Sequence, residues 1–195
     1  MKVLFIPAKH KLMDIESMIS KLKIKEKYSI VTTIQFVDEI KNATQILGCN
    51  ITKVKPSEAY LYVGTGKFHP LNLAFQTKKP VYTLDPFTKI FSKIDEQEVI
   101  NYERKKKAAL TKYLNAKVIG IIISTKPGQN QQKKALDFQK TCKKESYVFM
   151  CNEVKDLENF PQIECWVNTA CPRIFEDEFC KPILNLRDLK LLRKP

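Results

Sequence analysis

The sequence lacks the closely spaced cysteine motifs of classical metal sites. Neither a CxxC pair nor a CxxxCxxC loop occurs among its six cysteines. Zinc sites and typical iron–sulfur sites draw their ligands from such local clusters. The sequence therefore excludes a metal site built from one short segment, and it leaves only sites whose ligands the fold brings together from distant positions.

Familiar nucleotide-binding and hydrolase motifs are absent as well. The segment GTGKFH (64–69) has neither the GxxxxGK[ST] spacing of a phosphate loop nor the GxGxxG of dinucleotide-binding folds. Gly64 and Gly66 still indicate a backbone that closely approaches something. His69 is an acid–base candidate, but His10 is the only other histidine and no carboxylate lies nearby, which favours a structural role. The spacings assemble no Ser-His-Asp or Cys-His arrangement.

Long apolar runs are missing too. No run approaches the roughly 18 residues needed to span a bilayer, and the first residues do not have the pattern of a secretory signal. We therefore expect a soluble protein that does not enter a membrane. Six cysteines without such a signal favour a reducing compartment, so we expect free thiols and a cytoplasmic location.

Acidic residues are in the minority. The chain has 21 Asp and Glu against 34 Lys and Arg, which gives a formal net charge of +13. Such a charge favours acidic partners, including nucleic acid, ribosomes or an acidic protein. Most of the excess is lysine scattered along the chain, so a solvated, lysine-rich surface is the alternative interpretation.

Strand and helix patterns alternate along the whole chain, and a hydrophobic content of 44% is enough for a core. The alternation predicts an α/β fold in which parallel β-sheets are flanked by helices. Residues 89–115 contain no glycine or proline and predict a long connecting helix. This helix separates two similar small domains, residues 1–88 and 116–195.

The predicted elements of each domain follow from hydrophobic periodicity and from Gly and Pro stops. In the first domain, a helix includes residues 71–75, further helices are predicted at 12–24 and 36–47, and strands at 1–7, 28–36, 59–64 and 81–84. In the second domain, a helix ends near residue 144, others lie at 153–159 and 185–194, and strands at 117–125, 147–151, 164–170 and 181–184.

Cys171 is the cysteine best placed for chemistry. It follows the apolar strand predicted at 164–170, and Pro172 cannot continue the strand ladder. Ligands of open parallel sheets bind outside the carboxyl ends of the strands, where this thiol would lie. The alternative is a small buried hydrophobic side chain, as most free cysteines are.

The other five cysteines have different predicted roles. Cys165 shares the strand of Cys171 but lies roughly 20 Å from it along an extended chain, so only one of the two can belong to a compact cluster. Cys142, Cys151 and Cys165 are predicted to be structural thiols, and Cys180 is undecided. Cys49 follows directly after Gly48, where the helix predicted at 36–47 ends.

Six segments occur in an order that resembles the diphthamide synthase family, the archaeal and eukaryotic enzymes of the first step of diphthamide biosynthesis. The resemblance covers essentially the whole chain, and it corresponds to the second and third of three similar αβ domains. The segments are TIQF (33–36), QILGCN (45–50), YLYVGTGKFHPLNLAF (60–75), LDPFTKIF (84–91), WVNTACPRI (166–174) and KPIL (181–184).

The resemblance implies a specific chemistry. Each family domain contributes one cysteine to a central 4Fe-4S cluster, and the matching positions here are Cys49 and Cys171. The cluster binds S-adenosylmethionine at its open iron and releases a 3-amino-3-carboxypropyl radical, which adds to one histidine of translation elongation factor 2. Gln35, Gly64, Gly66 and His69 are the positions expected to line the S-adenosylmethionine pocket.

The chain departs from the family in three places. The first domain with its cysteine is absent, Thr65 and Lys67 replace an acidic residue and an arginine, and residues 126–129 replace a Gly-Arg-Gln-Gly loop. We therefore expect a split or truncated component that needs a partner chain for the third cysteine, within a homo- or hetero-oligomer. A non-catalytic partner of a complete enzyme and a basic nucleic-acid-binding module are the alternatives.

Overall fold

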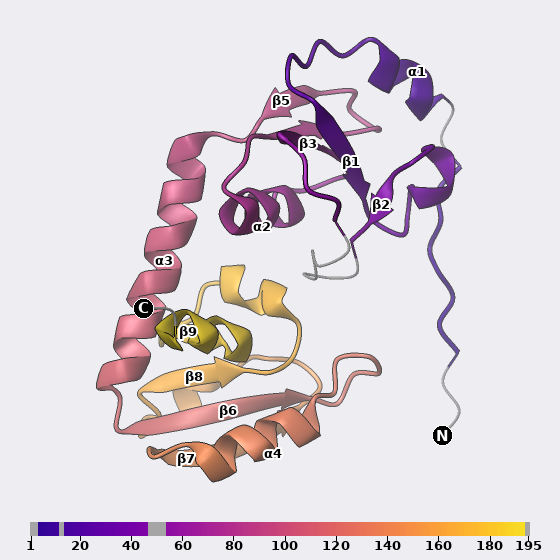
Figure 1. Ribbon diagram of the computed structural model, residues 1–195. Coiled ribbons are helices and arrows are strands. Elements are labelled where there is room, and N and C mark those ends of the chain that lie inside the picture. The colour runs from indigo at the N-terminus through magenta and orange to yellow at the C-terminus, as the bar shows by residue number, and fades with distance from the viewer. Residues whose placement is uncertain (1–3, 12–13, 47–53, 194–195) are drawn as a thin grey trace. The chain divides into compact units, whose positions relative to one another are not determined.

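The computed structural model describes residues 4–11, 14–46 and 54–193 of the chain. The chain forms two compact units, Met1–Glu103 and Arg104–Pro195, and the boundary falls inside helix α3 (Glu96–Asn115) (Figure 1). Each unit contains its own sheet with helices packed on it, so the predicted α/β fold is confirmed. The assignment of residues 1–88 and 116–195 as domains of the family type stays a prediction.

The sheet of unit 1 has five strands in the order β2-β1-β3-β4-β5. Strands β2, β1, β3 and β4 are parallel to one another, and the edge strand β5 pairs with β4 in the antiparallel direction. The strands are β1 (Tyr28–Thr32), β2 (Thr44–Gln45), β3 (Ala59–Val63), β4 (Val81–Leu84) and β5 (Phe91–Lys93). The helices are α1 (Ile15–Ser20), α2 (Phe68–Thr77) and the short 3₁₀ turn η1 (Val37–Glu39).

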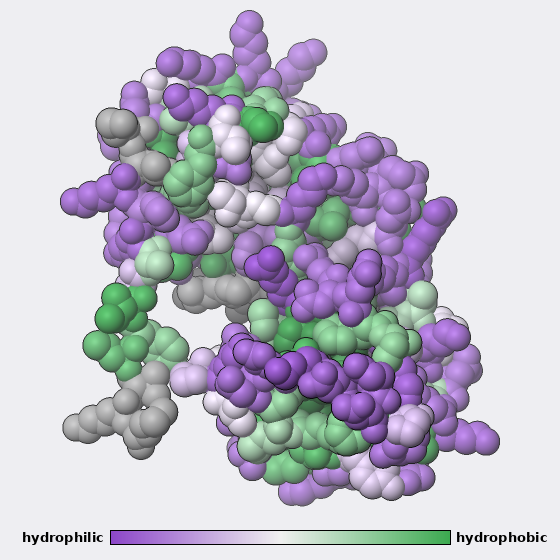
Figure 2. Space-filling model, turned by 180° about the vertical axis from the view of Figure 1, so that it is seen from behind, coloured by the Kyte–Doolittle hydropathy of each residue, from purple (hydrophilic) through white to green (hydrophobic). Residues whose placement is uncertain are grey.

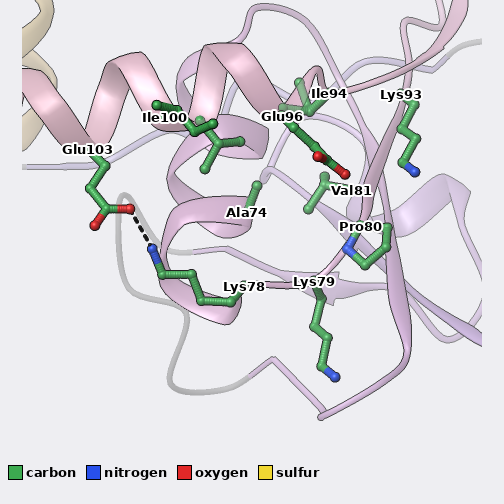
Figure 3. A pocket seen from close by; sticks show the side chains of 11 residues that line it. Ala74, Lys78, Lys79, Pro80, Val81, Lys93, Ile94, Glu96, Ile100 and Glu103 are labelled. Carbon is green, nitrogen blue, oxygen red and sulfur yellow. Dashed lines mark hydrogen bonds and ion pairs between the residues drawn. The ribbon is translucent and has the colours of Figure 1, made fainter.

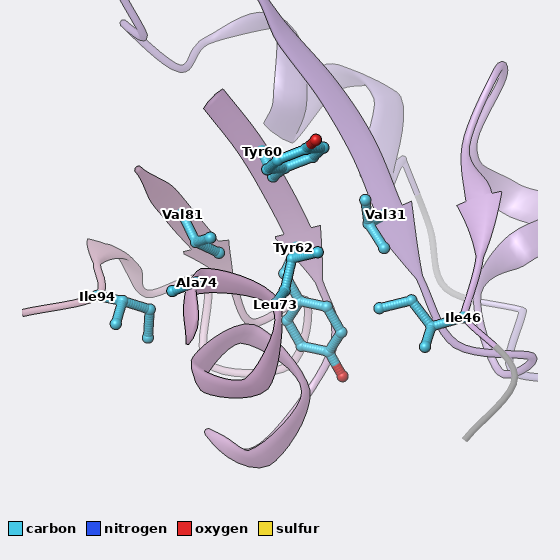
Figure 4. Close-up of a cluster of buried hydrophobic side chains, with 8 residues drawn as sticks. All are labelled: Val31, Ile46, Tyr60, Tyr62, Leu73, Ala74, Val81 and Ile94. Carbon is cyan, nitrogen blue, oxygen red and sulfur yellow. The ribbon is translucent and has the colours of Figure 1, made fainter. Parts of the chain in front are cut away.

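Strand β3 is buried on both faces, as its continuous apolar sequence predicts. Tyr60 and Tyr62 pack with Leu73 of α2 on one face of the sheet, in the cluster that Figure 4 shows. Leu61 and Val63 alternate with them and pack in a second cluster, which includes residues of α1. This double burial fixes β3 at the centre of unit 1.

The sheet of unit 2 has four parallel strands in the order β7-β6-β8-β9. They are β6 (Val118–Ser124), β7 (Glu145–Cys151), β8 (Cys165–Asn168) and β9 (Ile183–Asn185). Helix α4 (Gln132–Thr141) lies against β6 and β7, as Figure 1 also shows. Short 3₁₀ segments complete the unit: η2 (Leu157–Asn159), η3 (Pro172–Glu176) and η4 (Leu186–Arg193).

The core of unit 2 depends on a glycine beneath a tryptophan. Trp166 is fully buried on β8, and an added Cβ atom at Gly120 of the neighbouring β6 would lie 2.3 Å from its ring. Phe149 and Phe160 pack edge-on against the same indole, with centroid distances of 4.8 and 6.0 Å. The missing side chain of Gly120 thus makes room for the largest residue of the core.

Several predicted elements differ in the structure, because strands and helices need tertiary partners as well as local propensity. The strand predicted at 1–7 is absent from its described part, where Leu4, Phe5 and Ile6 pair with no strand and are 83, 67 and 81% exposed. The helix predicted at 36–47 is replaced by η1 and β2. Asn42 between them has a φ of +60°, which ends helical geometry, and β2 pairs with β1.

The helix predicted at 89–115 begins only at Glu96. Residues 91–93 form β5 instead, since they pair with β4 through the turn that Asp85 holds: its carboxylate accepts hydrogen bonds from the Phe87 and Thr88 amides. The segments predicted as helices at 153–159 and 185–194 form 3₁₀ turns, η2 and η4. In both sheets the strand core was predicted better than the segments around it.

The surface is rich in hydrophilic side chains (Figure 2). The face seen in Figure 2 is mostly hydrophilic, with polar side chains projecting over most of it. Within the described ranges, none of the helices is both long and apolar enough to cross a bilayer.

Replacing Gly120 with alanine should destabilise unit 2. The new Cβ atom would overlap the Trp166 ring, and we expect a loss of about 1–3 kcal/mol in the free energy of unfolding, measured by urea titration. The control is the same change in a Trp166→Leu background, where the ring is gone and the added cost should largely vanish. An equal cost in both backgrounds would contradict this packing account.

A buried ion pair fixes η4 to α3 within unit 2. The Lys106 ammonium, 2% exposed, contacts the Asp188 carboxylate and lies 4.7 Å from the Phe175 ring centroid. Lys106→Met should cost about 3 kcal/mol in unfolding free energy, since it removes the buried cation and leaves the partly buried Asp188 with Arg187, whose Nε lies 4.0 Å from its Oδ1. The double variant Lys106→Met, Asp188→Leu should recover most of that loss; no recovery would show that the pair is not the cause.

Candidate functional site

The carboxyl ends of the strands in unit 2 converge at one edge of the sheet. Strands β6, β7 and β8 end at Ser124, Cys151 and Asn168, and because all are parallel their following loops leave from the same side. The Thr125 amide donates to the Cys151 carbonyl at 2.9 Å, and the Lys126 amide donates to Ser124 Oγ at 3.1 Å. These bonds order the loop after β6 against β7.

A shallow cavity of ≈ 370 Å³ opens at this edge. Cys171 lines it together with two cationic side chains, Lys126 and Arg173. The remaining lining residues are Ser124, Gln129, Asn152, Glu153, Val154, Ile174 and Asp177. The cavity therefore offers one thiol among mainly polar and charged groups.

Cys171 lies where the sequence places it, just past the end of β8. It caps the turn η3, its backbone is extended with φ −64° and ψ 123°, and Pro172 opens the turn. Its side chain is neither fully buried nor fully exposed. The thiol is thus accessible from the cavity and is not one of the enclosed core cysteines.

Two buried asparagines hold the backbone around Cys171. Asn168 Nδ2 donates to the Cys171 carbonyl at 2.9 Å and to Asn185 Oδ1 at 2.8 Å, while its Oδ1 accepts from the Ala170 amide at 2.9 Å. Asn185 Nδ2 donates to the Pro172 carbonyl at 3.1 Å. The loop that carries the thiol is therefore fixed from the ends of β8 and β9.

Two of the other described cysteines, Cys165 and Cys151, are less suited to bind metal. Burial raises the pKa of Cys165 to about 12, so this core thiol stays protonated, whereas a metal ligand must be a thiolate. Burial also raises the pKa of Cys151. Cys142 lies 3.9 Å from the Tyr113 hydroxyl, and Cys180 is exposed. Cys165 is a core residue, as predicted.

Unit 1 has a corresponding edge at the carboxyl ends of β1, β3 and β4. Thr32 Oγ1 at the end of β1 donates to the Val63 carbonyl at 2.7 Å, and the Gly64 amide donates to the Leu84 carbonyl at 3.0 Å. The loops after the three strands are thereby held side by side. This edge contains the predicted residues Gln35, Gly64, Gly66 and His69.

The glycine loop between β3 and α2 requires both of its glycines. Gly64 has a φ of +153°, and an added Cβ atom would lie 2.8 Å from the Tyr62 hydroxyl; Gly66 has a φ of +74°. Burial, with a smaller contribution from the Asp85 carboxylate, raises the pKa of Tyr62 to about 12. The neutral Tyr62 hydroxyl donates to the Thr65 carbonyl at 3.4 Å and so links the glycine loop to β3.

His69 lies in the first turn of α2, with its ring centroid 6.0 Å from that of Tyr62 and 5.1 Å from that of Phe68. Gln35 lies after β1, where its Oε1 accepts from Thr33 Oγ1 at 3.0 Å and its carbonyl accepts from the His10 amide at 2.9 Å. Parallel pairing thus brings both residues to the edge that bears the glycine loop. Their predicted contact with S-adenosylmethionine stays a prediction.

Cys49 lies outside the described residues. In the sequence it comes four positions after Gln45, the last residue of β2, and β2 is parallel to β1. Among the residues that the structure describes, no three His, Cys, Asp or Glu side chains gather to hold a metal ion.

A cavity in unit 1 lies away from the residues predicted to line the S-adenosylmethionine pocket. It has a volume of ≈ 330 Å³ and lies where β4 begins and α2 ends. Figure 3 shows its apolar floor, which includes Ala74 and Val81, and the ion pair of Lys78 with Glu103 at 2.9 Å. None of Gln35, Gly64, Gly66 or His69 lines it, so it is separate from the candidate site.

The sequence interpretation missed the two asparagines and Tyr62. Asn168 and Asn185 are each 2% exposed and end otherwise apolar strands. A polar residue that closes an apolar run is a usable signal, since buried amides need hydrogen-bond partners. Tyr62 sits inside the apolar run 60–63, where its hydroxyl gives no separate pattern.

Two similar archaeal proteins carry the same enzyme name. A curated 2-(3-amino-3-carboxypropyl)histidine synthase from Methanocaldococcus jannaschii is 34% identical over 213 residues, which cover 99% of this chain and 62% of the relative. A protein of the same name from Pyrococcus horikoshii is 33% identical over 226 residues, covering 97% of this chain and 65% of the relative. This chain thus spans less than two thirds of the length of these relatives.

A solved structure has the same fold. The crystal structure of Dph2 from Pyrococcus horikoshii with a 4Fe-4S cluster is 33% identical and superposes with a TM-score of 0.72, over 91% of this chain and 59% of that one. Residues 38–194 match the protein family described as "Putative diphthamide synthesis protein". Because this match covers most of the chain, the chain belongs to the diphthamide synthesis protein family.

Proposed function

We propose that this chain is a component of a 2-(3-amino-3-carboxypropyl)histidine synthase and contributes Cys49 and Cys171 to a 4Fe-4S cluster. The observation that carries the proposal is the placement of Cys171: an accessible thiol on an ordered loop at the carboxyl end of a parallel sheet. Relatives that bear this enzyme name and a related structure with a 4Fe-4S cluster support the assignment.

The residues around Cys171 suit such a cluster. Cluster ligands are thiolates, which bring negative charge, and the same cavity is lined by the cationic side chains of Lys126 and Arg173 together with the acidic side chains of Glu153 and Asp177. The Cys171 side chain is partly exposed, whereas Cys165 is enclosed and protonated. Of these two cysteines, Cys171 is therefore the one that fits.

The glycine loop of unit 1 suits a bound small molecule. Nothing lies within 4 Å of the position that a Cβ atom would take at Gly66, so a ligand can approach the backbone there. In the proposed enzyme, Gly64, Gly66, Gln35 and His69 line the S-adenosylmethionine pocket. When bound, the cluster would supply the electron that cleaves S-adenosylmethionine into a 3-amino-3-carboxypropyl radical for transfer to a histidine of translation elongation factor 2.

The proposed cluster has a third protein ligand besides Cys49 and Cys171. Two cysteines of this chain leave one of three cluster ligands to be supplied, and this chain spans only 62 and 65% of its two archaeal relatives. We propose that a second polypeptide, with the fold of the family's first domain, provides the third cysteine in the cytoplasm. Three protein ligands leave one iron open for the substrate.

Anaerobic reconstitution of the full chain with iron and sulfide tests the cluster. Mixed with the first domain of the Methanocaldococcus jannaschii relative, the chain should bind about four iron atoms per complex by iron analysis, and after reduction with dithionite it should give an electron paramagnetic resonance signal of a reduced 4Fe-4S cluster. Cys49→Ala and Cys171→Ala should each lower the bound iron by more than about tenfold. Cys180→Ala is the matched control and should retain it; equal retention by all three variants would exclude the proposed ligands.

Transfer activity separates an enzyme component from a non-catalytic partner. The reconstituted complex, reduced with dithionite, should transfer labelled 3-amino-3-carboxypropyl from S-adenosylmethionine to elongation factor 2, and Cys171→Ala should lower the rate by at least about 100-fold. Gly66→Val, which fills the open side of the glycine loop, should raise the KM for S-adenosylmethionine. Full activity of a Cys49→Ala, Cys171→Ala variant would instead favour a stabilising subunit.

A further inference from the structure

We propose that Asn168 and Asn185 act as a positioning clamp that fixes the backbone on both sides of Cys171 and so sets the orientation of its thiol. The inference rests on the proposed function of Cys171 as a metal ligand and extends it to two residues that touch neither the metal nor the substrate. The clamp lies entirely within unit 2, at the ends of β8 and β9.

The two asparagine side chains bond to the backbone of Cys171 and of both its neighbours. The Ala170 amide, the Cys171 carbonyl and the Pro172 carbonyl each bond to one of the two asparagine side chains, at 2.9, 2.9 and 3.1 Å. The Cys171 carbonyl also accepts from the Ile174 amide at 3.1 Å, within η3. The backbone of three consecutive residues is thus held by two side chains.

The directions of the bonds are mutually consistent. Asn168 Oδ1 accepts from a backbone amide, so its Nδ2 must face the Cys171 carbonyl and Asn185 Oδ1, both of which are acceptors. Asn185 then has only its own Nδ2 left to reach the Pro172 carbonyl. A carboxylate at position 168 would face two acceptors, so an amide is required there.

Burial makes both asparagine amides depend on this loop. Both asparagines are 2% exposed, so their amides must find hydrogen-bond partners inside the protein. Their partners lie at residues 170–172, in the loop that carries the partly exposed Cys171 thiol. We infer that they limit its motion and thereby preorganise the ligand.

The test is the alkylation rate of Cys171 in the full chain without metal. Iodoacetamide is applied at one fixed pH, and mass spectrometry follows Cys171 relative to the exposed Cys180, which serves as an internal reference. The neutral variant Asn168→Leu removes three clamp bonds and should raise the Cys171 to Cys180 ratio by about tenfold. Asn185→Leu leaves the Cys171 carbonyl bond in place and should raise it by about threefold.

Asn152→Ala is the matched control, since Asn152 lines the same cavity but bonds only to Thr125 among these loops, at 3.5 Å. Its ratio should equal that of the wild type. An unchanged ratio in Asn168→Leu, or an equal rise at Cys171 and Cys180, would overturn the clamp and leave a merely structural role.

Reconstitution of the same variants with iron separates the two proposals. If the wild-type complex binds no cluster but the alkylation ratio still responds to Asn168→Leu, the proposed function fails and the clamp stands. If the wild type binds the cluster and Asn168→Leu changes neither the ratio nor the electron paramagnetic resonance signal, the clamp fails and the function stands.

Discussion

The parallel pairing of buried strands is the constraint on which both candidate regions depend. In unit 2, β6 lies between β7 and β8 with its odd- and even-numbered residues both packed in the interior. Parallel strands place all their carboxyl ends at one edge, so the loops after Ser124, Cys151 and Asn168 are neighbours although the sequence separates them widely. Unit 1 repeats this geometry around β3.

The same constraint explains why the buried polar side chains of the described strands occur at the strand ends. Inside the sheets, every side chain of β3 and nearly every one of β6 is buried and mostly apolar. At the ends, the ladder stops and free carbonyl and amide groups must find other partners. Thr32, Asn168, Thr169 and Asn185 supply them, and in doing so they order the loops that follow.

Membership of the diphthamide synthesis family suggests one task for each of these two sheet edges. The glycine loop offers exposed backbone at Gly66, and the second edge offers one accessible thiol beside cationic side chains. Small-molecule binding and metal ligation are different tasks, and each edge suits one of them. The chain covers 59% of the related structure with a 4Fe-4S cluster, and the proposed partner would supply the remaining ligand.

The sequence by itself determined the strand core and the location of Cys171. The apolar segments 59–64 and 117–125 predict strands, and Pro172 predicts the strand end, because these patterns are local. It did not reveal that residues 36–47 break at Asn42 and pair as β2, or that residues 91–93 join β4, since both outcomes depend on strands distant in the chain. The joint role of Asn168 and Asn185 was decided by the tertiary structure: an amide at the end of an apolar run signals a need for partners, but only the pairing of β8 with β9 brings the two amides together and places Asn185 next to the Pro172 carbonyl.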